Sequence, residues 1–407
     1  MNLLKRVTPL AILLYLAASC HSEHKIENVS LTQIKNQLNL LSVNFNEAKA
    51  RTGDSGKDFV SVRSLNSDGS LKIVSSKDWC SGFYAGSLWL ASDLTGDAGL
   101  KQLAREFTMP LEKEKFNGDT HDMGFKMMSS FGQGYRITRD SAYRDILIQA
   151  AKTLTTRFNE KVGAIRSWDH NRDKWQFPVI IDNMINLELL FWASKQTGDQ
   201  LYYNIAVKHA ETTLANHFRA DNSSFHVVDY DTITGAVIKK NTHQGYSDAS
   251  AWSRGQAWGL YGYSMCYRET GILSFLYQAE KIADFILKHP NLPTDKIPYW
   301  DFDAPASDAK PRDVSAAAIT ASALYELAQF VPEKKASYIN SAEQILKSLN
   351  GIYSSKPGEN KGFLLGHSTG SFPHNSEIDV PINYADYYYL EALLRQKNFK
   401  KLNQINK

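Results

Sequence analysis

Gln196-Thr197-Gly198-Asp199 joins two helical patterns and shows how the whole chain is built. Gly198 can adopt the left-handed conformation that ends a helix, and Asp199 can accept the free backbone N–H groups that begin the next one. An amphipathic segment follows the turn. Related turns recur at Leu94-Thr95-Gly96-Asp97, Ile137-Thr138-Arg139-Asp140 and Glu269-Thr270-Gly271. The chain is therefore predicted to be a series of helical hairpins.

The spacing of apolar residues predicts about twelve helices, which make six hairpins. One member of each pair, such as residues 319–330, is apolar nearly all round and suits an inner position. We therefore expect an all-α fold, a single-domain (α/α)6 barrel, with an open helical solenoid as the alternative. The helices are expected near residues 31–49, 80–95, 98–110, 121–137, 140–158, 181–196, 199–218, 249–268, 272–288, 313–330, 333–349 and 380–395.

Strand-like sequence is scarce. Residues 225–230 alternate, turn near Thr234-Gly235 and return through residues 236–238, which predicts one small β-hairpin near the mouth of the barrel. No linker rich in Pro, Gly and Ser follows residue 31. Residues 31–400 are therefore predicted to form one catalytic domain.

The first twenty residues are typical of a targeting segment. Lys5 and Arg6 precede a short apolar run, and Ala17-Ala18-Ser19 lead to Cys20, as in a bacterial lipobox. The run is too short to span a bilayer. We predict a signal peptide over residues 1–20, a lipidated Cys20, a short tether over residues 21–30 and export to the periplasm as a membrane-anchored lipoprotein. An ordinary secretory signal is the alternative.

Composition excludes some classes of partner. The formal charge of the 407-residue chain is only +3 and no basic run occurs, so no nucleic acid is expected. Beyond Cys20, Cys80 and Cys266 are predicted to be buried free thiols, with a disulfide between them as the alternative. The sequence leaves a monomer and a dimer equally open.

The chain lacks the motifs of several kinds of chemistry. None of the eleven histidines has zinc-site spacing, and no phosphate loop or nucleophile elbow occurs. We expect no catalytic metal and no cofactor. His209, His217 and His289 follow outer-helix patterns and are interpreted as surface or packing residues, whereas His121, His226 and His243 lie in chemically richer segments.

Those richer segments lie where the chain enters predicted inner helices. Alternate helices of an antiparallel ring point the same way, so these segments should gather at one mouth. A capping role suffices for Asp313, but Asp122 and Asp182 precede apolar helices, where an unused buried carboxylate would be costly. The segments are residues 78–83, 121–125, 181–184, 250–258 and 313–315.

Residues 243–258 hold two Trp, one Arg, one His and several amide or hydroxyl groups. Indole faces can stack on sugar rings, and a guanidinium fork matches a carboxylate. This combination suits an anionic sugar. Two carboxylates beside such a surface favour glycoside or uronide chemistry.

The same motifs resemble those of the unsaturated glucuronyl hydrolases, glycoside hydrolase family 88, over nearly all of the mature chain. They are Asp78-Trp79 with Ser81-Gly82-Phe83, His121-Asp122-Met123-Gly124-Phe125, Ile181-Asp182-Asn183-Met184 and Ser250-Ala251-Trp252-Ser253-Arg254-Gly255-Gln256-Ala257-Trp258. The resemblance implies an (α/α)6 barrel. It also implies a substrate whose non-reducing uronate carries a C4=C5 double bond, left by polysaccharide lyases.

The resemblance also implies roles for residues. Asp182 matches the general acid/base, and Asp122 matches a second essential carboxylate. The predicted substrate-binding residues are His226, Gln244, Trp252, Arg254, Trp258, His121 and Trp79. By resemblance, the acid protonates C4, water adds at C5, and the resulting hemiketal opens and expels the rest of the glycan.

For a proton donor the pKa must be raised, and burial of Asp182 near a like charge would raise it. Arg254 is expected to pair with the uronate or with a catalytic Asp, and Trp252 and Trp258 to stack on the sugar. The likeness fades over residues 380–388, which leaves substrate preference open.

Three other functions remain alternatives. An unsaturated rhamnogalacturonyl hydrolase of family 105 would share the barrel and the chemistry, but the 254–258 motif and the hairpin with His226 favour glucuronyl hydrolysis. A non-catalytic glycan-binding lipoprotein could use the same Trp and Arg residues without two buried Asp. A polysaccharide lyase would create the double bond instead of consuming it.

Overall fold

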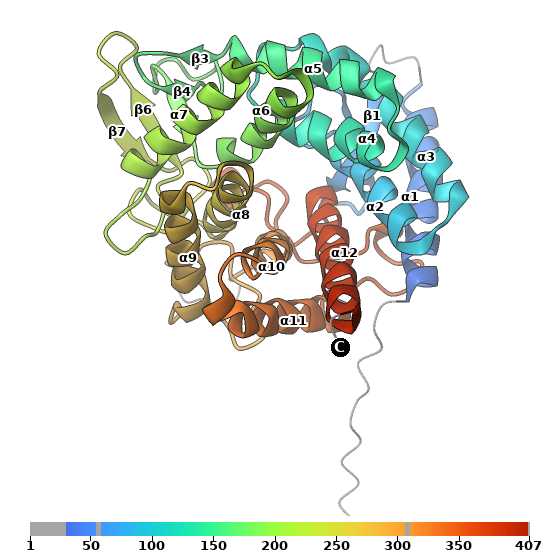
Figure 1. Ribbon diagram of the computed structural model, residues 1–407. Coiled ribbons are helices and arrows are strands. Elements are labelled where there is room, and N and C mark those ends of the chain that lie inside the picture. The colour runs from blue at the N-terminus through green and yellow to red at the C-terminus, as the bar shows by residue number, and fades with distance from the viewer. Residues whose placement is uncertain (1–29, 54–57, 306–309, 406–407) are drawn as a thin grey trace, which may run out of the picture.

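The computed structural model describes residues 30–53, 58–305 and 310–405. Within these ranges the chain forms twelve α-helices arranged as a ring of inner helices surrounded by outer ones (Figure 1). The predicted signal peptide, Cys20 and residues 21–29 of the predicted tether lie outside the described residues. None of the helices in these ranges is long and apolar enough to cross a membrane.

The inner helices form a closed circle. Each one contacts the next, and α12 contacts α2, so the structure is a barrel and the open solenoid is excluded. The inner members are α2 (Phe83–Thr95), the π-helix η2 (Gly124–Gly132) continued by α4 (Gln133–Thr138), α6 (Asn183–Thr197), α8 (Ser253–Thr270), α10 (Val314–Leu327) and α12 (Asn383–Ile405).

The outer helices cover this circle. α3 packs on α2, α7 on α6, α9 on α8 and α11 on α10, which gives the predicted hairpins. The outer members are α1 (Leu31–Arg51), α3 (Ala98–Thr108), α5 (Ser141–Thr155), α7 (Gln200–Asn216), α9 (Leu273–Lys288) and α11 (Lys335–Gly351). Short 3-10 helices lie at Met109–Phe116, Pro332–Lys334, Asn360–Gly362 and Phe372–His374.

The turn that repeats along the sequence has the predicted geometry. Gly96 and Gly198 end their helices with φ of 74° and 77°, in the left-handed region that glycine tolerates best. Asp97 and Asp199 then cap the next helix, because their side chains accept the N–H groups of Leu100 and Leu201. Local sequence therefore sets where each hairpin reverses.

Burial separates inner from outer helices as the apolar pattern predicts. Every residue of α10 is buried, whereas α3 buries only four of its eleven residues. His209 on α7 and His217 at its C-cap are buried packing residues: Nδ1 of His209 accepts the N–H of Ile165, and Nε2 of His217 contacts the carbonyl of Val179. Cys80 and Cys266 are buried free thiols, so the disulfide alternative is wrong.

Strands are more numerous than the sequence predicted. The expected hairpin exists as β6 (Val227–Tyr230) and β7 (Val237–Asn241), but β5 (Pro178–Ile180) joins it in a three-stranded antiparallel sheet. A second hairpin, β1 (Phe59–Leu65) with β2 (Leu71–Ser75), was missed, and so was the short pair β3 (Phe158–Asn159) and β4 (Ala164–Ile165).

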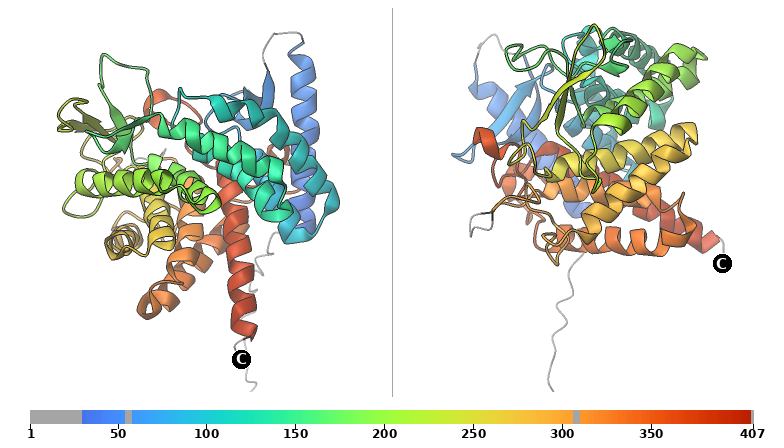
Figure 2. Two further views of the ribbon diagram at one scale, coloured as in Figure 1. Left: turned by 45° about the horizontal axis from the view of Figure 1, so that its top comes forward. Right: turned by 90° about the vertical axis from the view of Figure 1, so that its left-hand side faces the viewer.

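The missed hairpin had a sequence signal. Asp68-Gly69 is a typical hairpin-turn dipeptide, and Gly69 has φ of 75°. A bulge between Val62 and Ser64 interrupts the alternation of β1. Figure 2 shows this hairpin, in blue, beside the orange-red chain that leads into α12, and Ser64 forms a bridge with Ile382.

The inner helices begin later than predicted. α2, α8 and α10 start at Phe83, Ser253 and Val314, and the preceding residues form turns and isolated bridges at the mouth. α6 and α12 also begin later, at Asn183 and Asn383. The segment after His121 is not an α-helix at first but a π-helix, whose wider turn is common at functional sites. These deviations all occur where the candidate site is built.

Candidate active site

A cavity of about 470 Å³ opens where the starts of the inner helices meet. Its volume is in the range of small-molecule sites. Six of the nine residues predicted for the site line it, which confirms that the mouth segments converge: Asp182, Asp122, His121, Trp79, Gln244 and Arg254. His226, Trp252 and Trp258 lie behind its wall.

Asp182 stands between β5 and α6, where the backbone bond from Ile181 N–H to the carbonyl of His226 fixes the chain. It occupies the N-cap position of α6, yet its side chain makes no capping bond. The side chain is 11% exposed, and Oδ2 has no hydrogen-bond partner among the described residues. A capping role is therefore excluded for Asp182.

Burial raises the pKa of Asp182 to about 7, with a further rise from the negative charge of Asp122 and an opposing effect of Arg254. The sequence predicted these two causes of the rise. A carboxyl group with this pKa is largely protonated just below neutral pH and can donate a proton.

Asp122 lies beside His121 at the start of the π-helix and is less buried than predicted, with 17% of its side chain exposed. Oδ2 accepts the hydroxyl hydrogen bond of Thr120 at 2.5 Å, and Oδ1 lies 3.2 Å from Nε2 of His121. Burial lowers the pKa of His121 although Asp122 opposes this, so the imidazole is neutral. Asp122 therefore lines the cavity beside a neutral imidazole.

The two carboxylates are held together by close packing of η2 on α6. A Cβ atom on Gly124 would come within 2.4 Å of the Cα of Asn186, so only glycine fits. The side chain of Asn186 accepts the N–H of Phe125 at 2.9 Å. The glycine of the 121–125 motif is therefore required for the close packing of η2 on α6 next to the site.

Arg254 begins α8 and is 1% exposed. Its Nη1 donates to Oδ2 of Asp313 and to the carbonyl of Thr369, each at 2.6 Å, and Nη2 donates to the carbonyl of Gly370 at 2.5 Å. Within the described chain these bonds leave Nε–H and one Nη2 hydrogen without an acceptor. Two adjacent N–H groups of this kind match the two oxygens of a carboxylate.

Asp313 caps α10 as predicted, because Oδ1 accepts the N–H groups of Ser315 and Ala316. Its other oxygen pairs with Arg254, which the sequence did not predict. The expectation that Arg254 pairs directly with a catalytic Asp is wrong, because its carboxylate partner is the capping residue Asp313.

His226 supports the site without lining it. Its Nδ1 accepts the N–H groups of His243 and Gln244, both at 3.0 Å. An accepting Nδ1 places the proton on Nε2, which lies 3.8 Å from Oδ2 of Asp182. Burial lowers the pKa of His226 far below its usual value, so a neutral imidazole stands behind the carboxyl group.

Trp252 and Trp258 do not offer faces to the cavity, so the expected stacking on sugar rings is not supported. Trp252 packs between His226, at 4.6 Å, and the guanidinium of Arg254, also at 4.6 Å. Trp258 is completely buried against Phe125. Both side chains are enclosed because they belong to the start of an inner helix.

Other aromatic rings line the cavity instead. Trp79 was predicted, whereas Phe125, Trp168 and Tyr384 were not assigned to substrate. Trp168 stacks on His170 at 5.3 Å with an interplanar angle of 18°. Trp168-Asp169-His170 lies in the loop between β4 and β5, a region where the sequence pattern gave no helix to anchor a prediction.

Three charged residues of the cavity wall were missed altogether, Asp119 and an oppositely charged pair. Arg63 comes from the unpredicted β1, and Glu377 from the segment before α12. They form a close ion pair, with Nε of Arg63 2.6 Å from Oε1 of Glu377. Among the described residues no group of three or more His, Cys, Asp or Glu side chains could hold a metal ion.

The fold and the cavity together define a class: a glycoside hydrolase with an α/α barrel and a carboxyl group of raised pKa at its mouth. Profiles of known families give no match. The chain is 54% identical to the unsaturated glucuronyl hydrolase of Formosa agariphila over 80% of its own length and 81% of the relative's. It is 36% identical to the unsaturated chondroitin disaccharide hydrolase of Streptococcus agalactiae, over 80% and 82% of the two chains.

Solved structures agree. A heparin-specific unsaturated glucuronyl hydrolase superposes with a TM-score of 0.84 at 48% identity, over 91% of this chain and 97% of the other. The enzyme of Bacillus sp. GL1 gives 0.80 at 30% identity, over 90% and 97%. The chain belongs to the unsaturated glucuronyl hydrolases, glycoside hydrolase family 88.

Proposed function

We propose that the protein removes 4,5-unsaturated glucuronic acid from the non-reducing end of glycosaminoglycan oligosaccharides that lyases release. One observation carries the proposal: a carboxyl group with a raised pKa, Asp182, lines the same cavity as an arginine with an unused fork of donors, Arg254. Such a pair suits a reaction that protonates an anionic sugar. The names of the relatives refer to chondroitin disaccharide and heparin, and one related structure contains dGlcA-GalNAc6S.

In the proposed mechanism Asp182 donates its proton to C4 of the vinyl ether. Positive charge develops at C5 and the ring oxygen, and water adds at C5 while Asp182, now ionised, accepts a proton from it. The resulting hemiketal opens and the bond at C1 breaks, which releases the remaining glycan. Asp182 ends the cycle protonated, so the net reaction consumes one water molecule.

The neighbouring residues have supporting roles in this mechanism. Asp122 places a negative charge near the developing positive charge and raises the pKa of the acid. Arg254 binds the uronate carboxylate through Nε and Nη2. Gln244, whose Nε2 donates to the carbonyl of Gly370, leaves its amide oxygen to accept a sugar hydroxyl.

The rings of Trp79 and Trp168 supply apolar surface for the sugars in the cavity. His121 and His226, both neutral, lie beside Asp122 and Asp182 without adding positive charge. Trp252 and Trp258 act through packing: Trp252 supports the guanidinium of Arg254, and Trp258 supports Phe125.

The test is a panel of unsaturated disaccharides from chondroitin, heparin and rhamnogalacturonan. Loss of the ultraviolet absorbance of the C4=C5 group measures turnover. We expect turnover of one or more glycosaminoglycan products. Turnover of the rhamnogalacturonan product alone would replace the proposal with pectin-fragment hydrolysis, and no turnover with binding retained would support a glycan-binding lipoprotein.

We further propose that the protein is exported and anchored by a lipid on Cys20. The supporting observation is the order of basic, apolar and small residues before that cysteine. Expression with a radiolabelled fatty acid should label the wild type and not the Cys20→Ala variant. Labelling of neither, with cleavage after a nearby residue, would indicate an ordinary secretory signal.

A further inference from the structure

The loop of residues 369–377 forms one wall of the cavity and connects two parts of the molecule that are far apart in sequence. Gly370, Ser371 and Glu377 line the cavity. Glu377 has φ of 56°, a left-handed conformation that is unfavourable for a residue with a side chain. Such a conformation persists only where surrounding contacts hold it.

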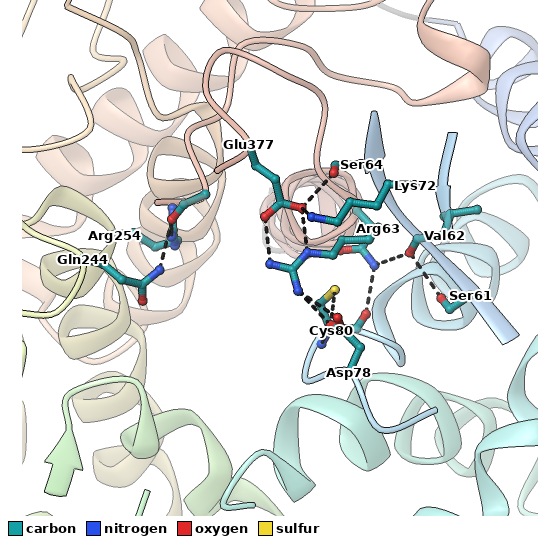
Figure 3. A network of polar contacts seen from close by, with 12 residues as sticks. Ser61, Val62, Arg63, Ser64, Lys72, Asp78, Cys80, Gln244, Arg254 and Glu377 are labelled. Carbon is teal, nitrogen blue, oxygen red and sulfur yellow. Dashed lines mark hydrogen bonds and ion pairs between the residues drawn. The ribbon is translucent and has the colours of Figure 1, made fainter. Parts of the chain in front are cut away.

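Those contacts are made by the side chain of Glu377 (Figure 3). Oε1 and Oε2 accept Nε and Nη2 of Arg63 at 2.6 and 2.7 Å in a bidentate pair. Oε1 also accepts the hydroxyl of Ser64 at 2.8 Å and Nζ of Lys72 at 3.2 Å. The carboxylate is 3% exposed. Four donors from the β1–β2 hairpin therefore converge on one buried carboxylate.

Burial alone would raise the pKa of Glu377, but Arg63, Lys72 and Ser64 outweigh it and hold the pKa at about 2. The carboxylate is therefore charged at neutral pH. The contact is charge-assisted and bidentate, the strongest kind of side-chain hydrogen bonding.

Arg63 also forms a second ion pair, through its other terminal nitrogen. Its Nη1 donates to both oxygens of Asp78, at 3.1 and 2.8 Å. Arg63 lies at the register irregularity of β1 between Val62 and Ser64 and lines the cavity. Two cations, Arg63 and Lys72, balance two carboxylates, Asp78 and Glu377, so this network has no net charge with which to attract the uronate.

The backbone of Glu377 carries the connection to Arg254. The carbonyl of Glu377 accepts the N–H of Gly370 at 2.7 Å. The carbonyl of Gly370 then accepts Nη2 of Arg254 at 2.5 Å and Nε2 of Gln244 at 3.0 Å. Glu377 is thus two hydrogen bonds away from the arginine assigned to the uronate.

Gly370 fits this arrangement only without a side chain. A Cβ atom at Gly370 would lie 2.6 Å from Oε2 of Glu377 and 2.8 Å from its Cβ. The side chain of Glu377 therefore packs directly against the Cα of Gly370, the residue whose carbonyl holds Arg254. A side chain added at Gly370 would displace Glu377.

We propose that Glu377 is a positioning residue for recognition of the uronate: by clamping the loop to the β1–β2 hairpin, it orients the free Nε and Nη2 donors of Arg254. The inference rests on the proposed function. It adds a residue that does not touch the uronate and explains why a neutral ion network lies beside the anion site.

The experiment compares the wild type with Glu377→Gln on a disaccharide that the wild type cleaves, and on the methyl ester of the same disaccharide. Gln keeps the size of Glu377 but removes the charge. We expect KM for the free acid to rise roughly tenfold, the effect of about 1.4 kcal/mol, with kcat little changed. The preference for acid over ester should fall by a similar factor.

Two further variants test the proposed route. Arg63→Ala should reproduce the loss of preference, and the double variant Arg63→Ala/Glu377→Gln should be no worse than the poorer single variant, because both changes break one contact. Gly370→Ala should also reduce the preference for acid over ester, because its new methyl group would clash with Glu377. As a matched control, Asp93→Asn weakens an exposed pair with Arg136 that lies outside the cavity and should leave both constants unchanged.

An unchanged ratio of acid to ester turnover in Glu377→Gln would overturn the proposal, even if the melting temperature fell, because that pattern indicates a purely structural role. Equal losses of kcat for acid and ester would also overturn it. Failure of the wild type to act on any unsaturated uronide would instead contradict the proposed function, so the two failures are distinguishable.

Discussion

Two buried carboxylates at opposite ends of the inner helices have opposite electrostatic environments. Asp182 lies at the mouth, and Glu326 lies near the far end of α10. Glu326 pairs with Nη1 of Arg268 and with Nη1 of Arg395, each at 2.6 Å. Asp182 instead has Nε2 of the neutral His226 beside it, at 3.8 Å from its Oδ2. Burial is similar, so the partners make the difference.

The pKa values follow the partners. Burial raises the pKa of Asp182 to about 7, but at Glu326 the charges of Arg268 and Arg395 outweigh burial and lower the pKa. One helix serves both ends, since α8 carries Arg254 at its start and Arg268 near its end, roughly 21 Å apart along the axis. The comparison teaches that the mouth is distinguished by a carboxyl group left without a strong cation.

A raised pKa alone does not identify the acid. Burial raises the pKa of Asp386 to about 8, yet this side chain accepts the backbone N–H groups of Leu364 and Leu365 and does not line the cavity. Asp182 differs in facing the cavity with an oxygen that has no partner among the described residues. Position and free bonding capacity together select it.

The largest expected effect is on turnover. Asp182→Asn should reduce kcat by about 10²–10⁴-fold, the usual contribution of a general acid, while substrate binding stays nearly intact. Turnover is measured by loss of the C4=C5 absorbance, and binding by calorimetry with the same disaccharide. Asp386→Asn, a carboxyl group outside the cavity, is the matched comparison. Wild-type turnover by the Asp182 variant would refute its role as the acid.

The paired carboxylate should matter for stability instead. Glu326→Ala removes the buried carboxylate that Arg268 and Arg395 share and should lower the free energy of unfolding by about 1–3 kcal/mol, because hydrogen bonds to charged groups are lost. Denaturant unfolding followed by circular dichroism measures the loss. The kcat of the folded variant should stay near the wild-type value. A large fall in kcat without a fall in stability would erase the distinction between the two ends.

The sequence predicted the barrel well because its signals are local. The reversals at Gly96-Asp97 and Gly198-Asp199 depend on a glycine followed at once by a capping Asp, and inner helices differ from outer ones in composition. The position of the site at one mouth of the barrel followed from the alternating direction of the helices alone. Asp182 and Asp122 could therefore be placed in one cavity without any distance information.

What the sequence could not predict depends on side chains brought together from distant segments. Arg63 and Glu377 are 314 positions apart, and nothing local to either indicates the pair. The exposure of Trp252 and Trp258 was misjudged because both occur in a motif rich in polar groups, while their burial depends on contacts with His226 and Phe125 from other elements. The residue types of the 243–258 motif indicated a sugar ligand, but they did not indicate which aromatic rings would face it.

The pH dependence of stability gives a smaller, sharper test of the comparison. The folded-state pKa of Asp182, about 7, lies above its ordinary value of 3.8, so the native state holds a proton that the unfolded state releases between these limits. Its contribution to stability is present at low pH and is lost as pH rises through about 7. Asp182→Asn removes that dependence.

We therefore expect the Asp182→Asn variant to gain in melting temperature relative to the wild type between about pH 5 and about pH 8, by a few degrees, because each kcal/mol shifts Tm by roughly 2–4 °C in proteins of moderate size. Calorimetric scans at both pH values measure the difference. A gain independent of pH would show that the carboxyl group is not protonated in the folded state.

The smallest effect is expected where a carboxylate is paired but exposed. Glu47 lies one helical turn from Arg51 on α1, with Oε2 3.4 Å from Nη2, and both side chains are largely exposed. Because water already solvates both ions, Glu47→Ala should change the free energy of unfolding by only about 0.3–0.5 kcal/mol. Denaturant unfolding at low and high salt measures it. A loss as large as that of Glu326→Ala would mean that pairing alone, without burial, sets the value of an ion pair here.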